Sequence, residues 1–165
     1  MIKKLCSIIL TAALLTACAG REQGSDLYGN SATGGWRDDV NITDLQATGM
    51  TKDFRSDVKD YVLFAFNSAA LSAEAKDSLK AQIDWLKAHP NVLIVIEGRC
   101  DERGTTEYNI ALGDSRANAV RRYLVANGIA SNRIKTISFG KDDPVALGST
   151  PAAWAENRRG TTVVY

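Results

Sequence analysis

A chain of 165 residues has the length of one ordinary domain, and its composition changes along its length, so the folded part should be shorter than the whole. Of the 20 basic residues, 18 remain once Lys3 and Lys4 are set aside, against 19 acidic ones; this balance argues against a nucleic-acid partner, which calls for a basic surplus. Three scattered cysteines exclude a disulfide framework and a zinc site.

The first 17 residues have the pattern of a signal peptide. Lys3 and Lys4 are followed by an almost wholly apolar run from Leu5 to Leu15. A permanent membrane-spanning helix needs about 20 apolar residues, so this run is too short to be a stable anchor. We therefore expect residues 1–17 to be removed, and Cys6 with them.

The residues Leu15-Thr16-Ala17-Cys18 resemble the lipobox of bacterial lipoprotein precursors. The resemblance implies that Cys18 is acylated, which would give the chain a covalent lipid and no other cofactor. The alternative is an ordinary thiol after a conventional cleavage site. In that family an aspartate after the cysteine retains the protein in the inner membrane. Ala19 stands there instead, so the resemblance implies a lipid anchor on the periplasmic face of the outer membrane.

The region from Cys18 to residue 57 is predicted to be a flexible tether. Six glycines lie among its polar residues without a sustained apolar period (Gly20, Gly24, Gly29, Gly34, Gly35 and Gly49). Trp36, Leu45 and Met50 are isolated apolar residues in it, either incidental or part of a partner-binding segment. Its polar stretch from Ala19 to about Arg55, about 37 residues long, would average about 35 Å end to end. Residues 58–165 are predicted to form one folded domain.

The domain begins with a β-prone run from Tyr61 to Phe66, which ends at a turn signal, Asn67-Ser68. Ser72 can cap a helix with apolar residues at helical spacing, and His89-Pro90 ends it, because a residue before proline avoids the helical region. The sequence therefore predicts a strand followed by a helix.

A continuous apolar run from Val92 to Ile96 predicts a central strand covered on both faces. The remaining predicted elements are a helical region ending at Asn127-Gly128, a strand from Ile134 to Phe139, a helical turn from Ala153 to Asn157 and a strand from Thr161 to Tyr165. This order, β-α-β-α-β-β with a short turn, predicts an α/β sandwich in which helices pack on a mixed four-stranded sheet.

A polar, glycine-flanked loop from Gly98 to Asn109 follows the predicted central strand, at the end where ligands collect in α/β sheets. Gly113 is expected to break the following helical region, which would place Arg116 in the first turn of a new helix. A guanidinium beside the free amides of that turn favours a carboxylate. Asp101, across the same cleft, would supply the opposite charge for an ammonium.

The stretch from Asp101 to Val120, Asp-Glu-Arg-Gly-Thr-Thr-Glu-Tyr-Asn-Ile-Ala-Leu-Gly-Asp-Ser-Arg-Ala-Asn-Ala-Val, resembles the OmpA-like peptidoglycan-binding domain. Within that superfamily the chain is most similar to the peptidoglycan-associated lipoproteins, or Pal proteins. The match extends from about Val62 to Tyr165. It includes Phe139-Gly140-Lys141 and Asn157-Arg158-Arg159, and the lipobox is in register with the same family.

The resemblance implies a non-catalytic protein whose ligand is the meso-diaminopimelate side chain of the peptidoglycan stem peptide. It implies that Asp101 takes the ammonium and Arg116 the carboxylate of that zwitterion. By the same resemblance, the remaining site residues are two hydrogen-bonding amides and two apolar wall residues (Asn67 and Asn109; Phe66 and Leu112). The implied role is to anchor the outer membrane to the cell wall within the Tol–Pal system, supporting envelope integrity and constriction at cell division.

Several assignments stay open at this level. Asn67 stands where many Pal proteins have aspartate, so any charge there is lost. Cys100 is either a buried, inert thiol or a regulatory or intermolecular one. Arg158 and Arg159 are either solvated or in contact with a ligand. Three charged residues near the cleft could form the surface that Pal proteins present to the β-propeller protein of the Tol system (Glu102, Arg103 and Glu107).

Three other interpretations compete with the implied function. Asp101 and Arg116 could form a structural ion pair. Asp101 with Glu102 or Glu107 could act as the acid and base of a peptidoglycan hydrolase. The domain could also be the peptidoglycan-binding end of a flagellar stator or a porin, but both of those need membrane-spanning segments, which we do not expect after cleavage at Cys18.

Overall fold

The computed structural model describes residues 49–165, with side chains from residue 53 onward. The predicted signal peptide, Cys18 and the greater part of the predicted tether lie outside these residues. The described elements are, in chain order, α1 (Gly49–Asp57), β1 (Tyr61–Leu63), α2 (Ala73–Ala88), β2 (Ile94–Arg99), α3 (Thr106–Ala126), the 3₁₀ helix η2 (Ser131–Arg133), β3 (Ile134–Gly140), α4 (Pro151–Asn157) and β4 (Arg159–Val164).

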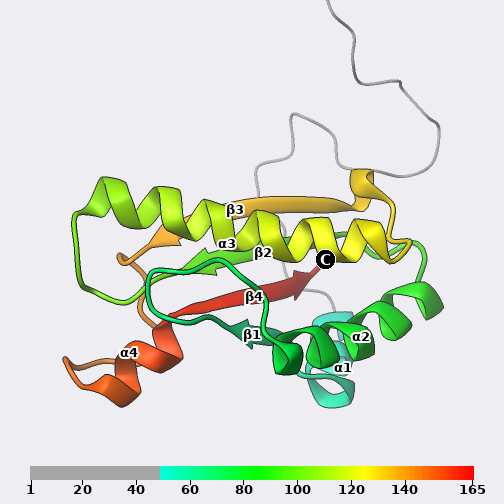
Figure 1. Cartoon of the computed structure of the whole chain (residues 1–165). Coiled ribbons are helices and arrows are strands. Elements are labelled where there is room, and N and C mark those ends of the chain that lie inside the picture. The colour runs from blue at the N-terminus through cyan, green and yellow to red at the C-terminus, as the bar shows by residue number, and fades with distance from the viewer. Residues whose placement is uncertain (1–48) are drawn as a thin grey trace, which may run out of the picture. The chain divides into compact units, whose positions relative to one another are not determined.

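The four strands form one mixed sheet in the order β1-β4-β2-β3. β2 and β3 are parallel, whereas β4 pairs antiparallel with both β1 and β2. Helices α2 and α3 lie across one face of the sheet (Figure 1). The predicted α/β sandwich with a mixed four-stranded sheet is confirmed.

The predicted helix signals act as expected. The Ser72 hydroxyl accepts a hydrogen bond from the backbone N–H of Ala75 at 3.1 Å, so it caps the start of α2. His89 is the C-cap of α2, directly before Pro90. After α3, Gly128 has a φ of +97°, a left-handed conformation that glycine adopts without steric cost.

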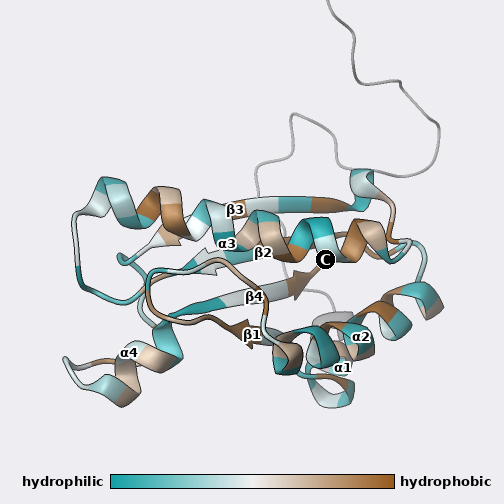
Figure 2. Ribbon diagram, viewed as in Figure 1, coloured by the Kyte–Doolittle hydropathy of each residue, from teal (hydrophilic) through white to brown (hydrophobic). Residues whose placement is uncertain are grey.

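Both main helices are amphipathic, with hydrophobic and hydrophilic residues alternating around each (Figure 2). Their apolar faces and the facing side chains of the sheet form one core, in which Leu79, Leu86, Ile94, Ile96 and Leu124 are fully buried. Burial of each such side chain contributes about 1.5–3 kcal/mol to stability.

The folded part begins earlier than the predicted boundary at residue 58, because Gly49–Asp57 forms the helix α1. Phe54 of this helix is fully buried, and its ring meets that of Trp85 edge-on, with centroids 4.9 Å apart. Met50, Phe54 and Val58 follow a four-residue spacing, but this short pattern beside a glycine-rich stretch was not interpreted as a helix. The burial of Phe54 is a tertiary contact with α2.

The strand boundaries differ from the prediction where side chains leave the sheet. β1 ends at Leu63 rather than Phe66, although the Phe64 backbone N–H still donates to the Arg158 carbonyl at 2.8 Å. Phe66 was predicted to lie in the strand because aromatic residues favour strands, but it lies beyond the end of β1 and is 60% exposed. The second and last strands are shifted, to Ile94–Arg99 and Arg159–Val164.

The predicted helix break at Gly113 is wrong, because α3 is continuous from Thr106 to Ala126. Gly113 lies where α3 crosses β2. A Cβ on the facing Gly98 would lie 1.9 Å from the Gly113 carbonyl oxygen. Two glycines are therefore needed for the helix and strand to approach this closely. Arg116 consequently lies in the interior of a long helix and not beside free amides in a first turn.

Candidate binding cleft

A cavity of about 190 Å³ opens where the loop after β2, the start of α3 and the turn after β1 meet. All six residues that the sequence assigned to ligand binding line it, together with four others (Phe66, Asn67, Asp101, Asn109, Leu112 and Arg116; Cys100, Arg103, Gly104 and Tyr108). Segments far apart in the chain thus contribute to one hollow.

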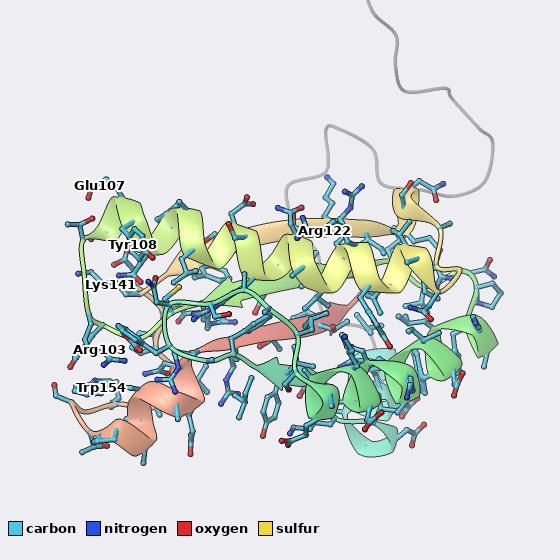
Figure 3. All side chains as sticks on the ribbon, in the orientation of Figure 1. Arg103, Glu107, Tyr108, Arg122, Lys141 and Trp154 are labelled. Atoms are coloured by element: carbon cyan, nitrogen blue, oxygen red, sulfur yellow. The ribbon has the colours of Figure 1, made fainter. Side chains whose placement is uncertain are left out.

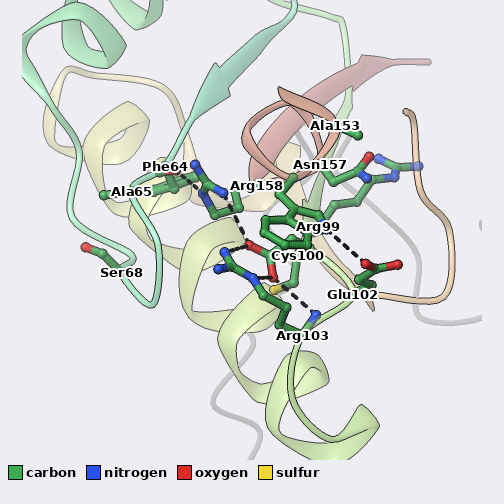
Figure 4. Close-up of polar contacts among 12 residues, drawn as sticks. Phe64, Ala65, Ser68, Arg99, Cys100, Glu102, Arg103, Ala153, Asn157 and Arg158 are labelled. Atoms are coloured by element: carbon green, nitrogen blue, oxygen red, sulfur yellow. Dashed lines mark hydrogen bonds and ion pairs between the residues drawn. The ribbon is translucent and has the colours of Figure 1, made fainter. Parts of the chain in front are cut away.

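Asp101 is buried at the base of this cavity, only 4% exposed. Its carboxylate accepts hydrogen bonds from the Arg103 guanidinium at 2.6 and 3.1 Å and from the Arg158 guanidinium at 3.3 Å. Figure 4 shows the two arginines converging from separate elements. Arg158 is therefore not a freely solvated residue, because its guanidinium forms an ion pair with the Asp101 carboxylate.

Arg116 is fully buried and bonds to three backbone carbonyl groups, two in the turn after β1 and one at the end of β2. Its guanidinium donates to the carbonyl oxygens of Arg99 at 2.8 Å, Ser68 at 2.9 Å and Ala65 at 3.1 Å. It also contacts the Cys100 sulfur at 3.2 Å. These acceptors use four of its five N–H donors. Among the described residues Arg116 therefore fixes the shape of the cavity, and no ion pair with Asp101 is present there.

Burial opposes the charged form of both Asp101 and Arg116. Burial opposes ionisation of Asp101, but the hydrogen bonds from Arg103 and Arg158 outweigh it and lower the pKa of the carboxyl below its ordinary value. Burial also lowers the pKa of the Arg116 guanidinium. A carboxylate with a lowered pKa is anionic at neutral pH. Asp101 therefore lacks the raised pKa that a general acid needs.

Arg103 extends over the cavity rim between two aromatic rings. Its guanidinium carbon lies 4.0 Å from the ring centroid of Phe66 and 4.3 Å from that of Trp154. The Trp154 indole N–H in turn donates to the Glu102 carboxylate at 3.0 Å. Arg103 and Trp154 lie at the same end of the molecule as Tyr108 (Figure 3). Arg103, for which the sequence left a partner surface open, lines the cavity, and Glu102 contacts it through Trp154.

The turn that carries Phe66 depends on Asn67. Its φ of +52° lies in the left-handed region, which asparagine tolerates better than most residues. Its side-chain carbonyl accepts a hydrogen bond from the Tyr108 hydroxyl of α3. Asn67 therefore holds the rim in place, a role that sequence spacing did not indicate.

Asn109 and Cys100 are buried structural residues of the cleft. The Asn109 amide donates to the carbonyl oxygens of Arg103 at 2.8 Å and Thr105 at 3.0 Å, and so closes the loop. The Cys100 thiol donates to the Asn109 carbonyl at 3.4 Å. Burial raises the pKa of this thiol despite the nearby Arg116, which agrees with a buried, unreactive cysteine.

The sequence did not identify Tyr108 or Arg103 as cleft residues, and it offered a partner surface only as a possibility for Arg103. Their positions could have indicated this, because Arg103 lies in the loop after the central strand and Tyr108 in the first turn of the helix that follows. Across residues 49–165, no group of three potential metal-ligating His, Cys, Asp or Glu residues occurs. Within the same range, no helix is long and apolar enough to cross a membrane.

Comparison with known proteins places the chain in a family. Residues 63–158 match the model of the OmpA family. The peptidoglycan-associated lipoprotein of Agrobacterium fabrum is 39% identical over 158 residues, which cover 95% of this chain and 85% of that protein. The protein of the same name from Rhizobium meliloti is 47% identical over 116 residues, 70% of this chain and 66% of that protein.

Solved structures agree with these matches. The peptidoglycan-associated lipoprotein from Burkholderia pseudomallei superposes with a TM-score of 0.63 at 44% identity, over 65% of this chain and 91% of that one. The C-terminal domain of Helicobacter pylori MotB, at 19% identity and a TM-score of 0.61, shares the fold over 65% of this chain and 84% of that one. The chain therefore belongs to the OmpA family and, within it, to the peptidoglycan-associated lipoproteins.

Proposed function

We propose that this protein binds peptidoglycan without cleaving it, by gripping the zwitterionic end of a meso-diaminopimelate side chain. One observation carries the proposal: an anionic Asp101 and a cationic Arg116 line the same small cavity, beside the apolar side chains of Phe66 and Leu112. An amino-acid end-group carries one ammonium and one carboxylate on the same carbon. A cavity with one buried acid and one buried base is complementary to it.

Each charged group already has partners within the protein. Asp101 accepts from two arginines, and Arg116 has one N–H donor beyond the four that are engaged. Arg103 is the partner of Asp101 with the more exposed side chain, 36% against 16% for Arg158. A charged hydrogen bond contributes about 1.5–3 kcal/mol, whereas association itself costs several kcal/mol. Binding of a single stem peptide is therefore moderate.

Anchoring would then depend on tethering and on many sites. An acylated Cys18 holds the chain to the periplasmic face of the outer membrane, because several acyl chains give firm membrane binding where one does not. A domain confined near the cell wall meets many stem peptides at high effective concentration. The proposed role is to link the outer membrane to the wall within the Tol–Pal system, with a Tol β-propeller protein as partner.

The ligand is tested by calorimetric titration of the mature-length chain with three short stem peptides. One peptide ends in meso-diaminopimelate, one has lysine in its place and so lacks the second carboxylate, and one has 2-aminopimelate and so lacks the free ammonium. We expect the first to bind at least tenfold more tightly than either analogue. Equal affinities for all three would refute the zwitterion site.

A control variant tests whether peptide affinity depends on charges in the cleft or only on the net charge of the protein. Arg122 is an exposed arginine at the other end of α3 from Tyr108 (Figure 3). Arg122→Ala removes one positive charge at a distance of about 21 Å along the helix, so it should leave the three affinities unchanged. Incubation of the protein with purified sacculi checks the other half of the proposal: release of soluble muropeptides would establish catalysis and contradict it.

The lipid anchor is tested separately. Metabolic labelling with palmitate should mark the unaltered protein and not Cys18→Ser. Label that persists in Cys18→Ser would contradict acylation at this residue.

A further inference from the structure

The carboxylate of Asp101 is fully engaged by donors of the protein itself (Figure 4). Its Oδ1 accepts from the Arg103 guanidinium at 3.1 Å and from the Arg103 backbone N–H at 3.3 Å. Its Oδ2 accepts from the Arg103 guanidinium at 2.6 Å and from the Arg158 guanidinium at 3.3 Å. Two carboxylate oxygens offer about four acceptor positions, and these four donors fill them. The ammonium of a ligand can therefore bind Asp101 only where one of the four leaves.

The four donors differ in how firmly they are held. The Arg103 backbone N–H is fixed by the loop after β2. The Arg158 guanidinium also donates to the Phe64 carbonyl oxygen at 3.0 Å, and its side chain is the less exposed of the two arginines. Among the described residues, Asp101 is the one hydrogen-bond acceptor of the Arg103 guanidinium. The Arg103 guanidinium is therefore the donor that can leave, and it holds the two shortest bonds to Asp101.

Arg103 has a second set of contacts, which does not involve Asp101. Its guanidinium carbon lies 4.0 Å from the ring centroid of Phe66 and 4.3 Å from that of Trp154. These contacts are made with the faces of the rings, whereas Asp101 is bound through N–H groups. The Glu102 carboxylate accepts from the Trp154 indole N–H and so restrains one of the two rings. A guanidinium that releases Asp101 can thus stay beside its aromatic neighbours.

We propose that Arg103 is a gate on the ammonium position of the cleft. In the closed arrangement its guanidinium occupies Asp101 as the ammonium of a ligand would. In the open arrangement it has left Asp101, which keeps its bond from Arg158. The gate rests on the proposed function, because it acts on the same ligand group. It keeps a buried, ionised carboxylate paired at all times, and it sets the affinity, which is the intrinsic affinity multiplied by the fraction of open molecules.

The gate acts only on ligands that supply an ammonium of their own. Such a ligand competes with Arg103 and then replaces its charge on Asp101. A ligand without the ammonium does not compete, and it leaves the gate closed. Removal of the Arg103 guanidinium should therefore strengthen binding of the first kind of ligand relative to the second.

The test compares two variants, each of which lacks one arginine partner of Asp101. Arg103→Met and Arg158→Met both replace a guanidinium by an uncharged, unbranched side chain. The mature-length proteins are titrated calorimetrically with the stem peptide that ends in meso-diaminopimelate and with the one that has 2-aminopimelate in its place. We expect Arg103→Met to raise the ratio of the two affinities at least tenfold over the unaltered protein. Arg158→Met, the matched control for the lost charge, should not raise this ratio.

A second measurement follows the gate itself. NMR of the ¹⁵N-labelled, unaltered protein records how fast the arginine Nε–H groups exchange with water. On saturation with the diaminopimelate peptide, the Nε–H of Arg103 should exchange at least tenfold faster, because it loses Asp101 as its acceptor. The Nε–H of Arg158, which donates to the Phe64 carbonyl, is the internal control and should exchange at an unchanged rate. The 2-aminopimelate peptide should leave both rates unchanged.

Three results would overturn the gate. They are an affinity ratio that Arg103→Met does not raise, an equal rise of that ratio in Arg158→Met, and an Arg103 Nε–H that stays protected in the saturated complex. If Arg103→Met does not fold, the exchange rates of the unaltered protein decide. The proposed function fails differently: equal affinities of the unaltered protein for the two peptides would refute the zwitterion site and the gate with it, whereas the three results above refute the gate alone.

Discussion

The floor and the rim of the cleft are built in different ways. The floor consists of Asp101, Asn109 and Arg116, all less than 5% exposed and each bonded to other segments of the chain. The rim includes Phe66, 60% exposed, and Tyr108, 50% exposed. Floor residues therefore support both the fold and any ligand, whereas the apolar rim can affect a ligand alone. Loss of binding in a floor variant does not by itself identify a ligand contact.

The largest expected effect is that of Arg116→Ala. It leaves three buried carbonyl oxygens without their donor, each at a cost of about 1–3 kcal/mol, so we expect a loss of at least about 3 kcal/mol in unfolding free energy. Urea denaturation measures it. Arg116→Lys keeps the charge but cannot reach all three acceptors, so its unfolding free energy should lie between those of the unaltered protein and Arg116→Ala. Unchanged stability in Arg116→Ala would show that the floor is not a structural element.

Asp101→Asn is expected to have the next largest effect. The amide keeps the size of the side chain but removes the charge that faces Arg103 and Arg158, which should cost about 1–3 kcal/mol of stability. Binding of a diaminopimelate peptide should weaken more than tenfold, because the acceptor for the ammonium is lost. Calorimetric titration at matched fractions of folded protein separates the loss of affinity from the loss of stability. Unchanged affinity would show that Asp101 does not bind the ligand.

The pH dependence of stability tests the same residue. Because hydrogen bonds hold the pKa of Asp101 below that of the unfolded chain, about 3.9, its contribution is complete above that value and is lost as the pH falls through the folded pKa. Between pH 5 and pH 2, Asp101→Asn should therefore lose less stability than the unaltered protein. Urea midpoints across this range measure the difference, and parallel curves would contradict it.

Phe66→Ala separates the rim from the floor. Because most of the ring is exposed, we expect unfolding free energy to change by less than about 0.5 kcal/mol. Peptide binding should weaken about three- to tenfold through loss of the apolar wall and of the ring beside Arg103. A loss of stability as large as that of Arg116→Ala would erase the distinction between floor and rim.

The smallest expected effect is that of Asn67→Gly. Glycine adopts the left-handed conformation of this position freely but lacks the acceptor for Tyr108, so we expect the two changes in unfolding free energy to offset to within about 0.5 kcal/mol. Asn67→Ala loses both the acceptor and the conformational tolerance and should be less stable than Asn67→Gly. Thermal unfolding compares the two. The reverse order would show that backbone conformation does not determine this residue.

Local patterns predicted most elements because local physics forms them. Ser72 caps α2, Pro90 follows its end and Gly128 closes α3 through interactions within a few residues. Gly113 misled the same reasoning, since a glycine within a helical pattern commonly marks a break. The need for glycine at position 113 comes from Gly98, 15 positions earlier, because α3 packs closely against the strand there. The buried Phe54 of α1 was missed for the same reason, because its partner Trp85 is distant in sequence.

The candidate site divides along the same line. The sequence by itself determined which residues gather at the cleft, because its motif and the end of the central strand together mark that position, and all six assigned residues line the cavity. Only the tertiary structure decided what each side chain does there. Arg116 bonds to carbonyls of Ala65, Ser68 and Arg99, and Asp101 bonds to Arg158 of a distant segment. Such partners are brought together by the packing of the sheet, and no local pattern encodes them.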